Sequence, residues 1–122
     1  MPTEKAGSGG IPEPEKKAVD ALLTRYCNER VPEHVRNKVR LLFRWRGATV
    51  TIFETRPYFQ DVNRWTESPI AQFRYNAADI HWTLFCPDRN SRWHLYLEVE
   101  PARSLQTLIE EVDRDPTGIF WG

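Results

Sequence analysis

The sequence is poor in several features that mark whole classes of protein. Its 122 residues include only two cysteines, which is too few for a disulfide framework, and they lack the Cys-x-x-Cys spacing of redox and zinc sites. No apolar run approaches the roughly 18 residues that span a bilayer, and no basic and hydrophobic leader opens the chain. We therefore expect a cytoplasmic protein with no membrane contact.

An excess of charge of one sign is also missing. The 17 Lys and Arg residues balance 17 Asp and Glu residues, and the pI is near 6.8, which excludes attraction of polyanions by bulk charge. The balance is uneven along the chain, because residues 36–96 carry 10 basic and 5 acidic side chains whereas residues 97–122 carry 2 and 6. Nine of those ten basic residues are arginines, which favour bidentate contacts with the carboxylates or phosphates of a partner, or with the protein's own acidic end.

What the sequence does contain is the pattern of one small domain. Residues 1–10 end in Gly-Ser-Gly-Gly and hold few large apolar side chains, so we expect a flexible N-terminal arm before a single domain over residues 11–122. Apolar residues recur at helical spacing over residues 15–28 and after Ser104, which predicts two helices with one buried face each. The residues at this spacing are Val19, Leu22, Leu23, Tyr26, Leu105, Leu108, Ile109 and Val112.

Between the helices the apolar period changes to two, which is typical of strands. The predicted strands cover residues 39–46, 49–56, 70–76, 80–86 and 92–98, with a long surface loop over 57–69. Five strands and two one-sided helices favour a two-layer α+β fold. In this fold a five-stranded antiparallel meander carries both helices on one face, in the order α-β-β-β-β-β-α, and its other face is left open.

Pairing of apolar residues across the strands sets the predicted register. Trp82 is placed opposite Phe73 and Leu97, and Leu84 opposite Leu95, so that these side chains share the face covered by helices. The same register gives the open face its arginine and aromatic side chains. The candidate binding residues on this face are Arg40, Arg44, Arg46, Phe53, Arg74, Phe85, Arg92, His94 and Tyr96, interspersed with Leu42 and Ile70.

Three interpretations of this open face follow from its residue types. Its apolar side chains favour the centre of an interface with a protein partner or a second copy of the chain, surrounded by a basic rim. Arginines beside aromatic rings on an exposed sheet also suit single-stranded nucleic acid, although the glycine- and aromatic-dense signature of common RNA-binding sheets is missing. The third interpretation is a solvated face whose rings are covered by residues 57–69.

A catalytic site is a further hypothesis for the same face. The predicted register aligns Arg74, His81 and Glu98 in one cross-strand row, where Glu98 would favour the imidazolium form of His81 and so suit it to acid–base chemistry. Three polar residues on an exposed sheet more often form a charge ladder, and no nucleophile is evident beside them. We therefore lean towards a protein that is not an enzyme.

The cysteine and histidine residues are too scattered to predict a metal site. A structural zinc site needs four convergent ligands, whereas Cys27 and Cys86 fall on predicted buried positions of a helix and a strand. Both are expected to be buried thiols, and no metal or cofactor is expected. The C-terminal residues 119–121, Ile-Phe-Trp, are expected to pack against the second helix rather than to dock to another protein.

Several segments together resemble a family of small bacterial proteins known only as a domain of unknown function. The segments are Ile52–Pro57, Ala71–Tyr75, Trp82–Phe85, Arg92–Tyr96 and Asp113–Gly122, and the closing Asp-Pro-Thr-Gly-Ile-Phe-Trp-Gly is the most specific of them. The resemblance spans about residues 11–122. It implies a stand-alone bacterial domain but supplies no activity, cofactor or substrate.

Overall fold

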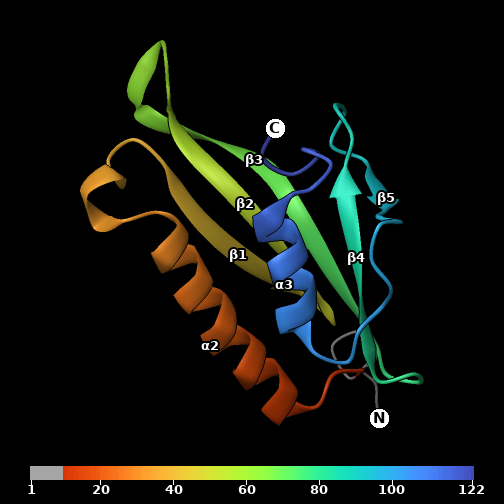
Figure 1. Ribbon diagram of the computed structural model, residues 1–122. Helices are drawn as coiled ribbons and strands as arrows, with labels where there is room; N and C mark the ends of the chain where they lie inside the picture. Colours follow the sequence, from red (N-terminus) through yellow and green to blue (C-terminus); the bar gives the residue numbers. More distant parts are fainter. Residues whose placement is uncertain (1–9) are drawn as a thin grey trace.

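The structure is a computed structural model that describes residues 10–122 (Figure 1). The flexible arm predicted for residues 1–10 lies, apart from Gly10, outside the described residues. The elements are α2 (Glu13–Arg30), a 3-10 turn (Glu33–Val35), β1 (Arg40–Arg46), β2 (Thr49–Tyr58), β3 (Asp61–Asn76), β4 (His81–Pro87), β5 (Trp93–Leu95) and α3 (Leu105–Arg114).

The five strands form one antiparallel sheet in the order β1-β2-β3-β4-β5, which confirms the predicted meander. Both helices cross the same face of this sheet, with α2 over β1 and α3 nearer β4 (Figure 1). The two-layer α+β fold, with strands between two helices, is therefore confirmed. Within residues 10–122, no helix combines the length and the apolar character needed to cross a membrane.

The core lies between the helices and one face of the sheet. Phe73 and Trp82 are fully buried there against Leu23 of α2 and Leu108 of α3. Two indole groups that point into this layer are satisfied by carboxylates of α2. Trp82 donates its Nε1–H to Glu15 (3.0 Å), and Trp45 of β1 donates its Nε1–H to Asp20 (2.6 Å). Because both helices are committed to this face, no described element covers the opposite face.

The surface loop predicted for residues 57–69 is wrong. Strands β2 and β3 continue through this region and turn tightly at Phe59 and Gln60, with Tyr58 paired to Asp61. The neighbouring strands stop earlier, since β1 pairs with β2 only as far as Thr55. Residues 56–66 therefore form a two-stranded ribbon, which projects beyond the sheet at the upper left of Figure 1.

A β-bulge at Ile70 makes the predicted face of this residue wrong. Ala71 pairs with Ile52 and Pro69 pairs with Phe53, so Ile70 is an extra residue on β3. Both Ile70 and Ala71 are buried in the core, whereas Ile70 was predicted to lie on the open face. Beyond the bulge the alternation is reset.

Turn chemistry explains two errors in the predicted register. Asn76 accepts hydrogen bonds from the backbone of Ala78 and Asp79 and widens the turn, so Phe73 pairs with Leu84 instead of Trp82. This shift of two residues keeps every side chain of β4 on its predicted face.

The β4–β5 register differs by one residue, which exchanges the faces of β5. Asp88 closes the connecting loop tightly, because its carboxylate accepts the N–H groups of Asn90 (2.8 Å) and Arg92 (3.0 Å). Pro87 therefore pairs with Trp93, and Phe85 with Leu95. Strand β5 also has three residues instead of the seven predicted.

The C-terminal aromatic residues Phe120 and Trp121 pack on the fold, as predicted, whereas Ile119, which was expected to pack with them, is exposed. Phe120 is buried with its ring 5.0 Å from that of Tyr96, and Trp121 donates its Nε1–H to the carbonyl of Val112 (3.0 Å). The two cysteine thiols are buried, also as predicted. Desolvation raises the pKa of Cys27 to about 11 and also raises that of Cys86.

Candidate functional site

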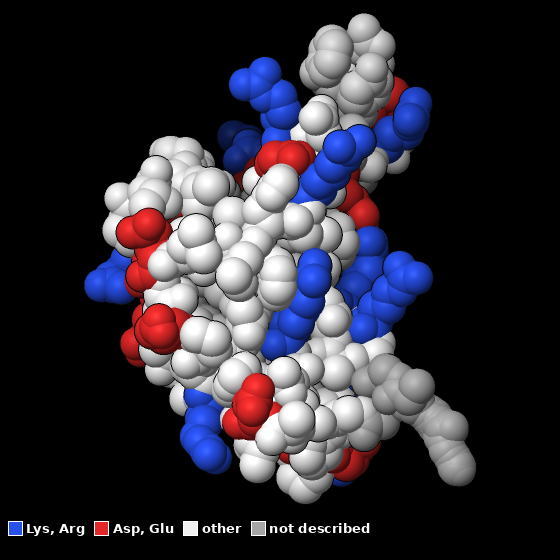
Figure 2. All heavy atoms as spheres, turned by 90° about the vertical axis from the view of Figure 1, so that its right-hand side faces the viewer, with Lys and Arg blue, Asp and Glu red and all other residues white. Residues whose placement is uncertain are grey.

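The open face of the sheet holds a groove of about 880 Å³. We call it the open-face groove; it is lined by Arg44, Trp45, Arg46, Thr49, Thr51, Phe53, Pro69, Gln72, Arg74, Ser91 and Trp93. Three of these eleven residues are arginines and none is acidic. In Figure 2, which views the molecule from its β5 edge, blue side chains gather on the right, the side of the open face, and several red ones lie on the left, the side of the helices.

The floor of the open-face groove is a short polar relay between β2 and β3. Gln72 donates from its amide nitrogen to the hydroxyl oxygen of Thr51 (3.0 Å), and it accepts from Nε of Arg74 (2.7 Å). Gln72 and Thr51 are buried although both are polar. The relay thus satisfies buried groups while fixing the guanidinium of Arg74 over the groove.

Two arginines of the groove lie over aromatic rings. The guanidinium carbon of Arg74 is 3.7 Å from the ring centroid of Phe85, and that of Arg44 is 4.8 Å from the centroid of Phe53. Desolvation lowers the pKa of Arg74, although an arginine stays charged at neutral pH. Each ring therefore makes a cation–π contact that holds one guanidinium group at the groove.

An acidic side chain outside the groove competes for one of these arginines. Glu67 of β3 forms a bidentate ion pair with Arg44, with one oxygen 2.9 Å from Nη1. This hydrogen bonding raises the pKa of Arg44 and lowers that of Glu67. Arg44 is exposed, so the ion pair is open to exchange with another anion.

Most of the predicted binding residues lie on the open face. Arg44, Arg46, Phe53 and Arg74 line the groove, and Phe85 lies directly beneath Arg74. Two predicted residues flank it without lining it. Arg40 lies on the same face of β1, with its guanidinium over the ring of Trp65, and Arg92 is exposed in the loop before β5.

The placement of His94 and Tyr96 on the open face is wrong. His94 pairs with the buried Cys86, so it lies on the helix side of the sheet, where its ring contacts Asp88 (2.7 Å). Tyr96 is buried on that side too and donates its hydroxyl to Glu111 of α3 (2.8 Å). The one-residue register shift at β5 moved both side chains.

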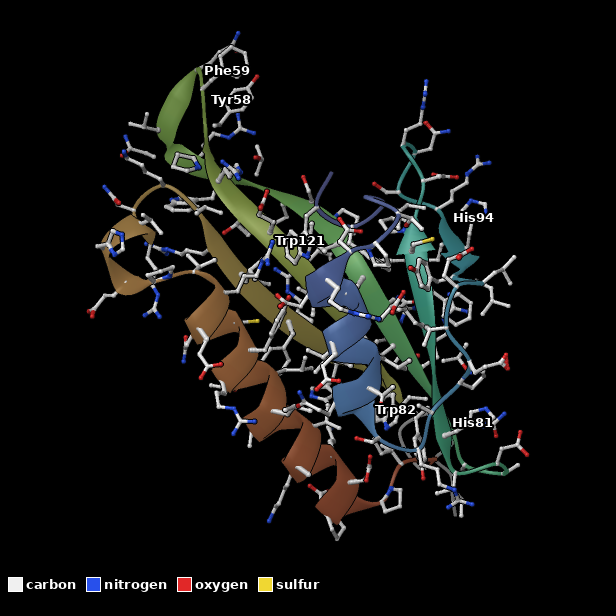
Figure 3. The ribbon with its side chains drawn as sticks, in the orientation of Figure 1. Tyr58, Phe59, His81, Trp82, His94 and Trp121 are labelled. Atoms are coloured by element: carbon white, nitrogen blue, oxygen red, sulfur yellow. The ribbon has the colours of Figure 1, made fainter. Side chains whose placement is uncertain are left out.

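The predicted catalytic row of Arg74, His81 and Glu98 is wrong, because the β3–β4 and β4–β5 turns set other registers. Arg74 pairs with Thr83 and His81 pairs with Asn76, so the arginine and the histidine are not direct neighbours. Glu98 lies beyond the end of β5 and pairs with neither. Figure 3 places His81 and His94 at opposite ends of β4, so these two histidines do not share a site either.

Sequence reasoning missed several residues in or beside the groove, of which Trp93, Trp65 and Thr51 matter most for the site. Trp93 was assigned to the core because of the β5 register error, and Trp65 was assigned to the loop that proved to be strand. Thr51 was passed over as an ordinary strand residue. Its position directly between Val50 and Ile52 was the available signal, because alternation places it on the open face.

Comparison with known proteins identifies the family but no activity. A family model described as "Domain of unknown function (DUF3024)" matches residues 11–122. No curated protein and no solved structure matches the chain. Within residues 10–122, moreover, no three His, Cys, Asp or Glu side chains gather as a metal site would require.

Proposed function

For a chain that belongs to the family described as a domain of unknown function (DUF3024), we propose a role in binding single-stranded nucleic acid through the open-face groove. The observation that carries the proposal is the composition of this groove. Its lining combines three arginines with aromatic and hydroxyl side chains and includes no acidic residue. Backbone phosphates would pair with the guanidinium groups, and bases would stack on their planes.

The arrangement of Arg44 and Arg74 supports bases as well as phosphates. Each guanidinium already lies over one ring, so it is positioned before a ligand binds and loses little further side-chain entropy on binding. The free side of a guanidinium plane is a stacking platform for an unpaired base. A duplex hides its base faces, so this surface favours single strands.

The groove offers little to an apolar protein surface. The ring of Phe53 in its lining and that of Phe85 beside it lie under guanidinium groups, and both are half-buried. The large apolar side chains most exposed to solvent lie elsewhere. They are Phe59, Val62, Ile80, Leu95, Leu97 and Ile119, and none of them lines the groove. This distribution favours nucleic acid over a protein partner at the open-face groove.

Self-association is a second candidate function, supported by the segment that follows the groove. Leu95, the last residue of the short edge strand β5, is 49% exposed, and Leu97 just beyond the strand is 80% exposed. Neighbouring exposed leucines at a sheet edge favour contact with a second copy or another protein. Sedimentation velocity of the wild type and Leu97→Asp tests this candidate, which predicts a dimer that the substitution dissociates.

The nucleic-acid proposal is tested by fluorescence anisotropy with labelled nine-nucleotide single strands of DNA and RNA at low salt. The double variant Arg44→Ser/Arg74→Ser is expected to bind at least tenfold more weakly, because two guanidinium groups are lost. Glu67→Gln is expected to bind two- to fivefold more tightly, because Arg44 is released from its ion pair. This gain cannot come from misfolding.

Matched controls separate the groove from general charge. The double variant Lys17→Ser/Arg25→Ser and the single variant Glu29→Gln change exposed residues of α2, on the opposite layer, by the same charges and are expected to leave the affinity unchanged. A wild type that binds no single strand, or a double variant that binds as well as wild type, would refute the proposal. Equal affinity for a duplex of the same length would refute its single-strand preference.

A further inference from the structure

The ribbon of residues 56–66 carries the arrangement of the groove beyond the edge of the sheet core. Arg40 of β1 lies over the ring of Trp65, with its guanidinium carbon 4.3 Å from the centroid. Nearer the tip, Arg64 lies over Tyr58 at 5.3 Å. Figure 3 shows Tyr58 and Phe59 at the far end of this ribbon. Arginine–aromatic pairs are therefore found on both parts of the β2–β3 hairpin.

The bulge at Ile70 places Trp65 on the same face as the groove. With the extra residue at position 70, Glu67 and Pro69 share the side of Phe53 and Thr55. Trp65, two residues before Glu67 in the sequence and paired with Pro57, lies on the same side. Arg40 belongs to the open face of β1, where Leu42 and Arg44 follow at the same alternation, and its Nε donates to the carbonyl of Arg36 (2.9 Å). Arg40 and Trp65 are thus oriented by the fold.

We infer that the ribbon is the second part of one binding track, on which a single strand continues from the open-face groove across Trp65 and Arg40. The inference rests on the proposed function and adds the length of the ligand. From Arg74 to Trp65 is nine residues of β3, or about 30 Å at roughly 3.3 Å per residue. At roughly 3.4 Å per stacked nucleotide this track accommodates at most about nine nucleotides.

The groove alone is shorter. From Arg74 to Pro69 is five residues of β3, which corresponds to about 17 Å and at most about five stacked nucleotides. The proposed ligand is therefore a strand of more than about five nucleotides, and four-nucleotide strands engage the groove only. Both lengths fall within the range of about 4–16 nucleotides that one OB-fold binds.

The test is a length series of four-, six-, nine- and twelve-nucleotide single strands, measured with wild type, Trp65→Ala, Trp65→Phe and Arg40→Ser. Wild-type affinity is expected to rise up to about nine nucleotides and then level off. Trp65→Ala is expected to weaken nine-nucleotide binding about tenfold, the loss of roughly one base stack, and to leave the four-nucleotide affinity unchanged. Trp65→Phe keeps an aromatic ring and should therefore retain most of the affinity for nine nucleotides.

The outcomes separate this inference from the proposed function. If wild type binds four nucleotides but gains nothing with length, or if Trp65→Ala weakens all lengths equally, the ribbon is not part of the track although the groove still binds. If wild type binds no strand of any length, both proposals fail. Circular dichroism and thermal unfolding of each variant confirm its fold, and Arg25→Ser serves as the charge control for Arg40→Ser.

Discussion

At the level of single side chains, Tyr96 joins the sheet to α3 by a buried hydrogen bond. The tyrosine is 4% exposed, and burial followed by the bond to Glu111 raises its pKa to about 12. The usual value is near 10. Because the folded pKa is the higher one, the neutral phenol stabilises the fold fully below about pH 10, and this stabilisation is lost as the pH rises towards 12.

We predict that Tyr96→Phe flattens this alkaline dependence. At pH 7 the variant should lose about 1–3 kcal/mol, because the buried Glu111 loses a donor and keeps only Arg114. Between pH 10 and 12 the free energy of unfolding of the wild type should fall towards that of the variant. Urea unfolding of both proteins at each pH measures this difference in stability. The raised pKa of Tyr26 affects both proteins alike and cancels from the difference. A constant difference from pH 8 to 12 would contradict the prediction.

Asp115 fixes the C-terminal motif through two backbone hydrogen bonds. It follows α3 in the left-handed region (φ 46°), and its carboxylate accepts the N–H groups of Phe120 (3.0 Å) and Trp121 (2.8 Å). The guanidinium of Arg30 covers the Trp121 ring at 4.1 Å. This geometry explains the spacing from the Asp to the Phe-Trp pair in structural terms, without a role in binding.

We predict that Asp115→Ala destabilises the protein by about 2–4 kcal/mol, because two charged hydrogen bonds are lost and alanine is strained at positive φ. Asp115→Asn keeps one acceptor oxygen and tolerates this backbone conformation, so its loss should be less than half as large. Chemical unfolding gives both values, and tryptophan emission reports release of Trp121. If the two variants were equally unstable, the hydrogen bonds to residues 120 and 121 would not be the cause.

At the level of elements, alternation in the sequence predicted which side chains share a face better than which residues pair. Arg44, Phe53 and Arg74 lie on the open face because a period of two needs no knowledge of the turns. The register depended on the side chains of Asn76 and Asp88, whose hydrogen bonds set the length of each turn. Those bonds form only in the folded turn and have no periodic signal.

The ribbon was missed because its sequence lacks the alternation of a strand. Residues 57–69 show no apolar period and therefore indicated a loop. The prolines at its two ends, Pro57 and Pro69, both lie where one neighbouring strand is lacking, since β1 ends its pairing at Thr55 and β4 at Gln72. A proline is tolerated in a strand on a side that needs no N–H donor. The bulge at Ile70 then reset the alternation, so periodicity could not place Trp65 beside the groove.

We predict that the ribbon opens more readily than the rest of the hairpin. Within the ribbon, Arg56 and Tyr58 of β2 pair only with Thr66 and Asp61 of β3, whereas Phe73 pairs with β2 on one side and with β4 on the other and is buried in the core. Native-state hydrogen exchange should give the ribbon amides protection several kcal/mol below that of Phe73. Equal protection in both regions would mean that the ribbon is held as firmly as the core.

At the level of the whole molecule, the zero net charge conceals two differently charged sides. The sheet presents Arg44, Arg46 and Arg74 with no acid in the groove lining, while α3 and the segment after it hold an acidic excess on the other side (Figure 2). The expectation that bulk charge attracts no polyanion is compatible with this arrangement, because attraction at a groove depends on local charge. The salt dependence of binding distinguishes attraction by the local charge of the groove from attraction by the net charge of the protein.

We predict a modest slope for the logarithm of the single-strand association constant against the logarithm of salt concentration. Three groove arginines at roughly −0.7 per phosphate contact give a slope of about −2. Arg74→Ser should reduce its magnitude by about 0.7. Arg25→Ser changes the net charge identically from the helix layer and should leave the slope at about −2. If both substitutions changed the slope alike, binding would follow overall charge, and the arginines of the groove would have no special part in it.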